Sequence, residues 1–450
     1  MAVIAQVEFP FEGRRTVRAR FDAEPISSDG GALMLSGIDD ALGLTASMAD
    51  AIRDERDSRY IQHPVHELIR QRVVCIGHGY EDCNDARTLR FDPVIKTACG
   101  RDPASGPLAS QPSLSRLENS VGAFTCYRIA EALLESYFKR HPKPPKKLIL
   151  DVDDTADPTH GQQQLSFFNA FYDTYLYLPL LVFDGNGDLL AAVLMPGKRK
   201  PGKTIASILR RIIRRIRAHW PKVELLVRAD SQFASSAMLR MCRELETHFI
   251  LGLQPNSVLK KKGAKLAAEA QAHHERTGEK ARLFTSMWHR AEKARPRWPR
   301  SYRLVVKAEH TALGSNVRFV ITDLHGPAAD LYEHYVQRGE ACENSIKDLK
   351  NVLKADRLSC SAFWANQFRL LLHAAAYVLM FQLRRAASGT ELANAQMDTL
   401  RLRLLKVAAR VQSTVRHVWL HLTSAHPWQQ LWCLIGERIA RRSWLLLPNA

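Results

Sequence analysis

The amino-acid sequence predicts an α/β protein in which a mixed β-sheet with flanking helices follows a mainly helical N-terminal region. Between residues 30 and 140, apolar side chains recur at helical intervals. From Leu148 onward, short apolar runs typical of strands take over and then alternate with helical stretches. The Pro-rich, basic segment 141–147 separates the two patterns and predicts a linker.

The helical region is expected to form a separate N-terminal domain over residues 1–140. The apolar periodicity predicts helices at 40–53 and 65–77. A long periodic run then ends at Arg140, and Ser110 or Ser113 is placed to cap its N-terminus.

The strand-like region begins with three consecutive apolar runs, LILDV, LYLPLLVFD and LLAAVLM. The segment DGNGD between the last two predicts a β-hairpin. A helix at 204–219, the strand LLVRA, a helix at 234–246 and the strand FILGL come next. Three strands followed by alternating helix and strand are the pattern of a ribonuclease-H-like core.

The predicted core is interrupted. Its first part is expected at 148–253. Residues 254–315 are polar, basic and irregular, which predicts an inserted subdomain between the second strand-end Asp and a later helical Glu. The second part of the core, at 316–386, begins with the strand RFVITDL, and a C-terminal helical region is expected at 387–450.

The composition favours a polyanionic partner. The chain of 450 residues has a formal net charge of +18 and a pI of about 9.7, while 46% of its residues are hydrophobic. It can therefore bury a large core and leave an excess of Lys and Arg on its surface, which attracts nucleic acid but also acidic membranes or ribosomes.

The cysteines and the apolar runs predict a protein of the reducing cytoplasm. Eight scattered cysteines without a C-x-x-C pair suit free thiols and argue against a structural zinc site. The N-terminus lacks the pattern of a signal peptide. The longest apolar run, LLLHAAAYVLMFQL, is too short to span a bilayer and predicts a buried helix.

Three acidic residues are the candidates for chemistry. Asp153 and Asp230 each follow an apolar strand, and Glu343 lies in a charged helical stretch. Carboxylates at strand ends and on a later helix can converge on divalent metal, which predicts metal-dependent phosphoryl transfer. Asp151 shares the strand face of Asp153 and stays open as the first ligand. In isolation, the strand-end residues also fit a simple capping role.

The helix that carries Glu343 adds polar side chains of its own. Lys347 and Lys350 follow on the same helical face and could contact phosphate, and Tyr335 and Arg338 lie upstream. A solvated charged helix would show the same pattern.

A second basic helix is predicted between Gly197 and Lys222, where ten basic residues occur without one acidic residue. An apolar stripe from Ile205 to Ile216 would face the core, and the arginines would face solvent. We expect a track for the DNA backbone here, formed by Arg210, Arg211, Arg214 and Arg215. Trp419, Trp428, Trp432 and Trp444 are expected to be core anchors rather than base-stacking platforms. P-loop, dinucleotide-binding, nucleophile-elbow and H-E-x-x-H motifs are absent.

Taken together, the sequence resembles the DDE transposases of bacterial insertion sequences, and most closely the thirteen-eighty family. The resemblance rests on six stretches in the family's order: SSDGGALML, GYEDCNDARTLRFDP, LASQPSLSRLEN, LDVDDTADPTHGQQ, LLVRADSQFAS and YVQRGEACENSIKDLK. It implies two Mg²⁺ ions, replaceable by Mn²⁺, and DNA cutting at terminal inverted repeats followed by joining to target DNA. It also implies a homodimer that holds two DNA ends.

The resemblance places the family's two Asp and one Glu on Asp153, Asp230 and Glu343. The accompanying Tyr, Arg and Lys fall on Tyr335, Arg338 and Lys350. The family pattern has three residues between the Arg and the Glu, whereas four separate Arg338 from Glu343 here. The excess residue would turn Arg338 away from Glu343 unless Gly339 or a local bulge absorbs it.

Two alternatives stay open: a ribonuclease-H-like nuclease that cuts without joining, and a DNA-binding regulator with a dead site. The several short helices before the linker further predict that residues 1–140 bind the terminal repeats.

Overall fold

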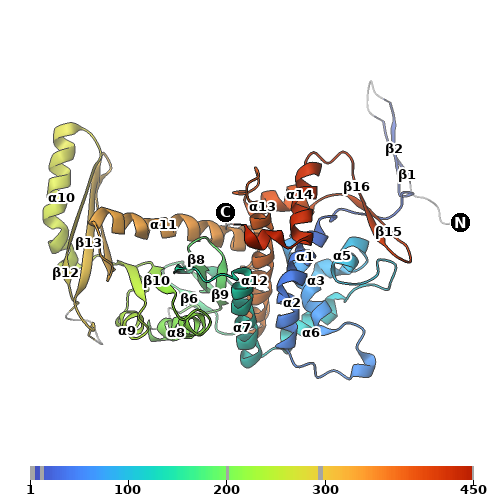
Figure 1. Ribbon diagram of the computed structural model, residues 1–450, viewed down its shortest axis with the longest axis horizontal. Coiled ribbons are helices and arrows are strands. Elements are labelled where there is room, and N and C mark those ends of the chain that lie inside the picture. The colour runs from blue at the N-terminus through green and yellow to red at the C-terminus, as the bar shows by residue number, and fades with distance from the viewer. Residues whose placement is uncertain (1–5, 11–14, 199–201, 292–296, 448–450) are drawn as a thin grey trace.

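The computed structural model describes residues 6–10, 15–198, 202–291 and 297–447. A large mixed sheet and its helices occupy one side of the elongated molecule, and a helical body occupies the other (Figure 1). Helix α12 (Phe363–Ala386) runs between them and is buried along almost its whole length. This is the buried helix that the longest apolar run predicted. Among the described residues, no helix has the length and apolarity needed to cross a membrane.

The main sheet has eight strands in the order β12-β13-β14-β11-β10-β4-β8-β9. Three parallel strands form its centre: β4 (Lys147–Asp154), β10 (Glu224–Ala229) and β11 (His248–Leu253). On one side, β8 (Leu180–Asp184) and β9 (Leu189–Val193) continue it as the predicted hairpin around DGNGD. The mixed sheet with its many helices agrees with the α/β fold class that the sequence predicts.

Helices cover both faces of this sheet because its central strands are apolar on both sides. Leu225, Val227 and Ala229 of β10 belong to the core under α8 (Gly202–His219) and α9 (Ser236–Glu244). Leu226, between them, packs on the opposite face with Leu331 and Tyr332 of α11 (Ala328–Lys347). Because successive side chains of β10 point to opposite faces of the sheet, α11, which carries Glu343, packs on the face opposite α8.

Residues 254–315, predicted as an inserted subdomain from their irregular sequence, have regular secondary structure. This segment forms a long helix, α10 (Ser257–Thr277), and the strands β12 (Ala281–His289) and β13 (Tyr302–Thr311), which reach the core through β14 (Gly314–Thr322). Helix α10 buries only Leu259, Gly263 and Ala270, so its apolar stripe is faint in the sequence. The added strands extend the main sheet beyond β11.

The helical body combines residues from both ends of the chain. The helices α1 to α4, α6, α7 and α12 to α14 pack into a shared core with α12 at its centre, and β8 and β9 contribute to the same core. Helix α5 packs in a smaller core with residues of α1 and α3. Their bounds are α1 Ala32–Leu42, α2 Leu44–Asp50, α3 Val65–Gly77, α4 Ala86–Leu89, α5 Pro93–Ala98, α6 Gln111–Ser120, α7 Ala123–Arg140, α13 Met397–Leu400 and α14 Gln429–Ala440.

Two predicted helices have different bounds from those expected. The helix expected at 40–53 is split into α1 and α2 at Gly43, whose positive φ of 61° ends α1. The long run expected to end at Arg140 is split into α6 and α7 by the extended backbone at Val121 and Gly122. The helix predicted at 65–77 is confirmed as α3.

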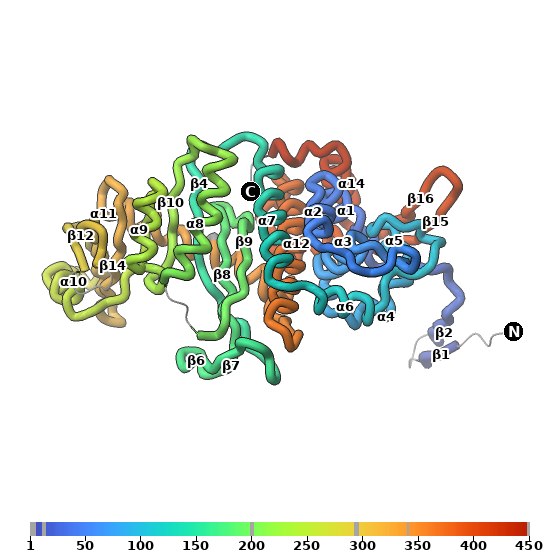
Figure 2. The backbone as a smooth tube through the Cα atoms, turned by 90° about the horizontal axis from the view of Figure 1, so that it is seen from below, coloured from blue at the N-terminus to red at the C-terminus, as the bar shows by residue number. Residues whose placement is uncertain are grey.

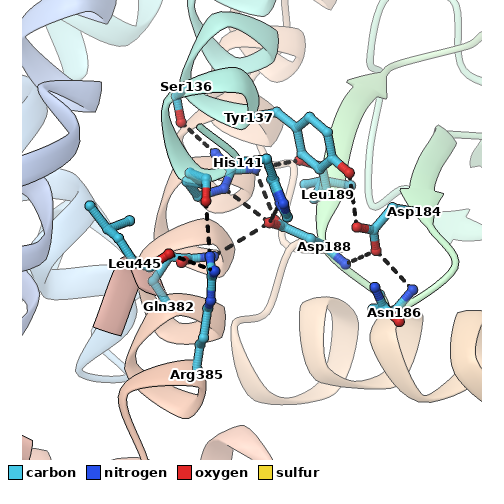
Figure 3. Close-up of polar contacts among 12 residues, drawn as sticks. Ser136, Tyr137, His141, Asp184, Asn186, Asp188, Leu189, Gln382, Arg385 and Leu445 are labelled. Atoms are coloured by element: carbon cyan, nitrogen blue, oxygen red, sulfur yellow. Dashed lines mark hydrogen bonds and ion pairs between the residues drawn. The ribbon is translucent and has the colours of Figure 1, made fainter. Parts of the chain in front are cut away.

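A buried polar network joins the helical body to the sheet (Figure 3). Arg140, the last residue of α7, donates two hydrogen bonds of 3.0 and 2.9 Å to Asp188 in the β8–β9 hairpin. Arg385 of α12 donates to the backbone carbonyl of Arg140 at 3.0 Å. Burial alone would raise the pKa of Asp188, but Arg140 and His141 hold it at about 2. The segment 141–147 is therefore anchored at its start, close to the sheet.

Short strands and turns complete the fold. Three small sheets contain β1 (Gln6–Phe9) with β2 (Val17–Arg20), β3 (Ile26–Ser27) with β15 (Ala409–Ser413) and β16 (Val418–Leu422), and β5 (Asp157–Pro158) with β6 (Phe167–Asn169) and β7 (Thr174–Tyr177). The single turns are η1 Ser58–Tyr60, η2 Cys83–Asp85, η3 Asp348–Val352, η4 Arg401–Leu405 and η5 Ser443–Leu446.

The cysteines agree with the sequence prediction, and the tryptophans agree with it only in part. The eight cysteines, all in the described part of the chain, are free thiols as predicted. Trp444 is a core residue, but Trp419 is 54% exposed, so the core role predicted for it is wrong. Alternation along β16 turns the Trp419 side chain away from the side on which Leu420 packs.

Candidate active site

The two predicted strand-end aspartates lie at the same edge of the sheet. Strands β4 and β10 are parallel neighbours in which Val152 is paired with Ala229. The residues that follow this pair are Asp153 and Asp230, so both carboxylates emerge at the carboxyl ends of adjacent strands. Asp230 also accepts a hydrogen bond of 2.9 Å from the backbone N–H of Gln232, which fixes the turn after β10.

Asp151, the alternative first ligand, has a structural partner instead. It is completely buried and receives two hydrogen bonds of 2.7 Å from the guanidinium of Arg228 on β10. Arg228 also donates to the backbone carbonyl of His334 on α11 at 2.9 Å. Burial raises the pKa of Asp151, and Arg228 opposes this effect. The pair ties β4, β10 and α11 together, which leaves Asp153 as the more accessible carboxylate.

Helix α11 brings Tyr335 and Arg338 over the two aspartates. The Nη1 atom of Arg338 lies 2.7 Å from Oδ2 of Asp153, and the guanidinium carbon lies 5.9 Å from the centre of the Tyr335 ring. Burial alone would lower the pKa of Arg338, but the Asp153 carboxylate raises it well above its usual range. The Arg338 charge is therefore permanent and directed at Asp153.

Tyr335 reaches the backbone beside Asp230 because Gly252 of β11 leaves room for it. A Cβ atom at Gly252 would stand 2.6 Å from the Tyr335 hydroxyl and 2.9 Å from the backbone nitrogen of Ser231. Burial raises the pKa of Tyr335, and the charge of Asp230 raises it further. The hydroxyl therefore stays protonated as a donor at neutral pH.

Sequence reasoning missed two residues of this site. Gln232 donates from Nε2 to Asp154 at 2.7 Å while its backbone bonds Asp230, so it connects the ends of β4 and β10. Tyr172 comes from the turn between β6 and β7, and its pKa is raised by burial and then by the charges of Asp154, Asp153 and Asp230. The pair Phe171–Tyr172, two aromatic residues between the predicted strands LILDV and LYLPLLVFD, was the only sequence signal.

The residues predicted downstream on α11 do not join the two aspartates. Helix α11 continues through Gly339 to Lys347, so neither Gly339 nor a local bulge absorbs the excess residue between Arg338 and Glu343. Five positions of regular helix turn Glu343 about 140° from Arg338. Glu343 is exposed, and its Oε1 lies 3.9 Å from the position of a Cβ atom on Gly339.

The backbone changes only after Lys347, where η3 forms a π-helical turn. Lys347 is exposed, whereas Lys350 within the turn donates to the carbonyl of Ala156 at 2.6 Å. Lys350 therefore supports the segment after β4 in this arrangement.

The donor set suits a hard divalent cation only in part. Asp153 and Asp230 offer carboxylate oxygens at one edge, which is the ligand type that Mg²⁺ and Mn²⁺ prefer. Within the described residues, no three Asp, Glu, His or Cys side chains gather closely enough to hold a metal ion. Arg338 supplies the positive charge next to Asp153 in this arrangement.

The predicted basic helix is α8, and its apolar stripe faces the core as expected. Two of its arginines have acidic partners from neighbouring helices: Arg210 pairs with Glu244 of α9, and Arg215 lies 2.5 Å from Glu135 of α7. Arg211 stacks over the Tyr127 ring at 5.6 Å, and Arg214 is exposed. Residues 199–201, at the start of the predicted basic segment, lie outside the described residues.

Comparison with known proteins decides the class of the chain. The family model described as transposase DDE domain group 1 matches residues 9–444. The chain belongs to this family. The match spans nearly the whole sequence, so the helical body and the sheet are both parts of one DDE transposase.

The other two comparisons add little to this assignment. A solved structure of piggyBac transposase in a synaptic complex with hairpin DNA is similar with a TM-score of 0.41 and 10% identity, over 84% of this chain and 80% of that chain. No curated protein matches this DDE transposase.

A buried carboxylate near the transposase site predicts a pH-dependent stability. Both oxygens of Asp157 are buried without a hydrogen-bond partner among the described residues, and burial raises its pKa to about 8. Its pKa in the unfolded chain is about 3.9. Since the folded protein holds the proton more tightly, the contribution of Asp157 to stability is fully present below about pH 4 and is lost as the pH rises toward 8.

Asp157→Asn is therefore expected to become more stable than the wild type as the pH rises. The difference in unfolding free energy should grow by up to about 1.4 kcal/mol per pH unit between pH 5 and 8. Melting temperatures of both proteins across this range measure the effect, and a constant difference would contradict it.

Proposed function

We propose that this chain is a transposase of the thirteen-eighty family that cuts DNA at the ends of an insertion sequence and joins those ends to target DNA. The observation that carries the proposal is the placement of Asp153 and Asp230 at adjacent strand ends beneath Tyr335 and Arg338, in a chain that belongs to the DDE family. Double-stranded DNA is the proposed substrate, and its charge suits the net +18 of the chain.

In this proposal Asp153 and Asp230 hold divalent metal, with Mg²⁺ as the proposed ion and Mn²⁺ as a substitute, and Glu343 completes the set. When bound, such ions activate water or a 3′-hydroxyl and stabilise the leaving oxygen. Because Glu343 lies away from Asp153, the competent arrangement requires a rotation or shift of α11 near Gly339. The same movement would separate Arg338 from Asp153 and free its guanidinium for a phosphate.

Tyr335 and Tyr172 have supporting roles in the proposed reaction. The Tyr335 hydroxyl, beside Ser231, is placed to donate a hydrogen bond to a DNA phosphate next to Asp230. The charges of Asp154, Asp153 and Asp230 act on Tyr172, and the neighbouring Phe171 is exposed, so both aromatic rings are proposed to stack on unpaired bases. Lys350 holds the backbone after β4 and contacts DNA only if it leaves the Ala156 carbonyl.

The proposal is tested with the purified full-length chain, Mg²⁺ or Mn²⁺, and DNA that carries the inverted repeats flanking its gene. Cutting at the repeat ends and recovery of those ends inside a target plasmid are expected. Cutting without joining would favour the nuclease alternative. Binding without metal-dependent cutting would favour a regulator with a dead site.

Residues 1–140 are proposed to bind the terminal repeats within a homodimer that holds two DNA ends. Because these helices share their core with α12, a fragment that ends at Arg140 would lose much of that core. Repeat binding is therefore best mapped by footprinting with the full-length chain.

Charge reversal on α8 is expected to weaken DNA binding regardless of DNA sequence. The variant with Arg210, Arg211, Arg214 and Arg215 changed to Glu should lower affinity and flatten the salt dependence. The slope of log K against log salt should fall by about 0.9 for each lost phosphate contact. Reversal of Arg211 and Arg214 alone should give most of the effect, because the other two arginines already pair with Glu244 and Glu135. If the slope of log K against log salt does not change, the arginines of α8 face solvent and do not contact DNA.

A further inference from the structure

The β15–β16 hairpin, residues 409–422, is a projecting element to which the proposed reaction assigns no role. We call it the C-terminal ribbon. It extends from the end of the helical body that lies opposite β12 and α10 (Figures 1 and 2). Its only strand neighbour within the described chain is the two-residue strand β3, which pairs with Ala409 and Arg410 at the base. Most of the ribbon length is therefore free of the rest of the sheet.

The two faces of the ribbon differ in chemistry. One face carries Ala409, Val411, Leu420 and Leu422, which pack against the core under α1, α3 and α5. The pairs Arg410–His421 and Gln412–Trp419 follow from the strand register and occupy the opposite, outward face. The apolar face thus fixes the ribbon to the helical body and presents the polar face to solvent.

The outward face is an ordered row of side chains. The Trp419 ring lies between His417 and His421, with ring centres 6.1 and 6.4 Å away. The Nε2 atom of His421 lies 3.3 Å from Oε1 of Gln412, which links the two strands across this face. A hydrogen bond of 2.8 Å from Thr414 N to the His417 carbonyl closes the tip. The row is therefore held in place before any partner binds.

The charge of the ribbon is of one sign. It contains Arg410 and Arg416 and no acidic residue. Arg410, at the base, pairs with Glu24 at 2.6 Å, and the exposed Arg416 stands at the tip. The ribbon itself supplies Arg, Gln, His and an exposed Trp but no carboxylate, and the Glu24 carboxylate lies only at its base, beside Arg410. This chemistry suits a polyanion with base edges better than it suits the apolar core of a protein interface.

We propose that the C-terminal ribbon enters the major groove of double-stranded DNA and reads base edges there; this inference rests on the proposed function. A two-stranded ribbon fits a major groove about 12 Å wide. Gln412 can pair with adenine, Arg416 can pair with guanine, and Trp419 can contact a thymine methyl group. Asp153 and Asp230 lie at the ends of β4 and β10. The helical body stands between these strands and the ribbon, so the ribbon would read DNA away from the bond that is cut (Figure 2).

The ribbon is tested in the full-length chain with the triple variant Gln412→Ala, Arg416→Ala and Trp419→Ala. We expect at least a tenfold loss of affinity for terminal-repeat DNA, a smaller loss for random DNA, and unchanged cleavage at saturating DNA. The control is Trp288→Ala with Arg441→Ala, two exposed residues of the same types on β12 and after α14. The control variant should bind both DNAs as the wild type does.

A crosslinking experiment with the wild type makes the test independent of how the variant folds. Terminal-repeat DNA substituted with iododeoxyuridine is irradiated with the protein, and the crosslinked peptides are identified by mass spectrometry. A crosslink within residues 409–422 is expected. Crosslinks confined to other segments, or equal losses on terminal and random DNA, would overturn base reading by the ribbon. Ribbon crosslinks in a protein that never cuts DNA would instead overturn the proposed enzyme function alone.

Discussion

Asp153→Asn and Asp230→Asn are each expected to abolish metal-dependent cleavage while DNA binding is largely retained. Each change removes one ligand charge and almost no volume, at the edge where β4 and β10 end side by side. Loss of a residue that only supports a metal ligand typically costs 10- to 100-fold in activity or metal affinity. Loss of a ligand itself should therefore lower the cleavage rate by more than about 100-fold. Single-turnover cleavage of end DNA in Mg²⁺ and in Mn²⁺ measures it.

Glu343→Gln should give the same loss, with Glu340→Gln as the matched control on the same helix. The control is expected to keep most cleavage, because Glu343 alone keeps Lys350 at the family distance. If Glu340→Gln loses activity and Glu343→Gln keeps it, the third ligand lies one helical turn upstream. If the Asp153→Asn variant still cleaves DNA, the assignment of Asp153 as the first metal ligand is wrong.

Arg228→Met is expected to have the largest effect on stability. It leaves the completely buried Asp151 without the two hydrogen bonds of 2.7 Å that compensate its charge. Breaking a buried ion pair on one side typically costs about 3–5 kcal/mol. Denaturant unfolding should show a loss of this size, or an earlier thermal transition where unfolding is irreversible.

The matched control replaces both partners. The double variant Arg228→Met with Asp151→Leu removes the buried charge together with its partner, so it should recover most of the lost stability. Equal losses in the single and double variants would mean that Arg228 acts through its bond to the His334 carbonyl rather than through Asp151.

Much of the catalytic half was predictable because its strands carry strong local signals. The apolar runs that precede Asp153 and Asp230 form β4 and β10 as expected, and the DGNGD turn closes β8 onto β9. Helix α10 within the segment 254–315 was not predicted, because it buries few large side chains and its periodicity is therefore weak. The core under α12 joins residues from both ends of the chain, a long-range pairing that no local pattern encodes.

The site was predictable as a list of residues but not as an arrangement. Local spacing indicates where strands end and which residues share a helix face. These signals, together with the resemblance to the family's motifs, identified the site residues Asp153, Asp230, Tyr335 and Arg338. Tertiary packing alone decided that Arg228 neutralises Asp151, that Arg338 faces Asp153, and that Gln232 and Tyr172 join them. These contacts join elements that are far apart in the chain, so local sequence patterns do not reveal them. They form because a buried charge without a partner costs much free energy.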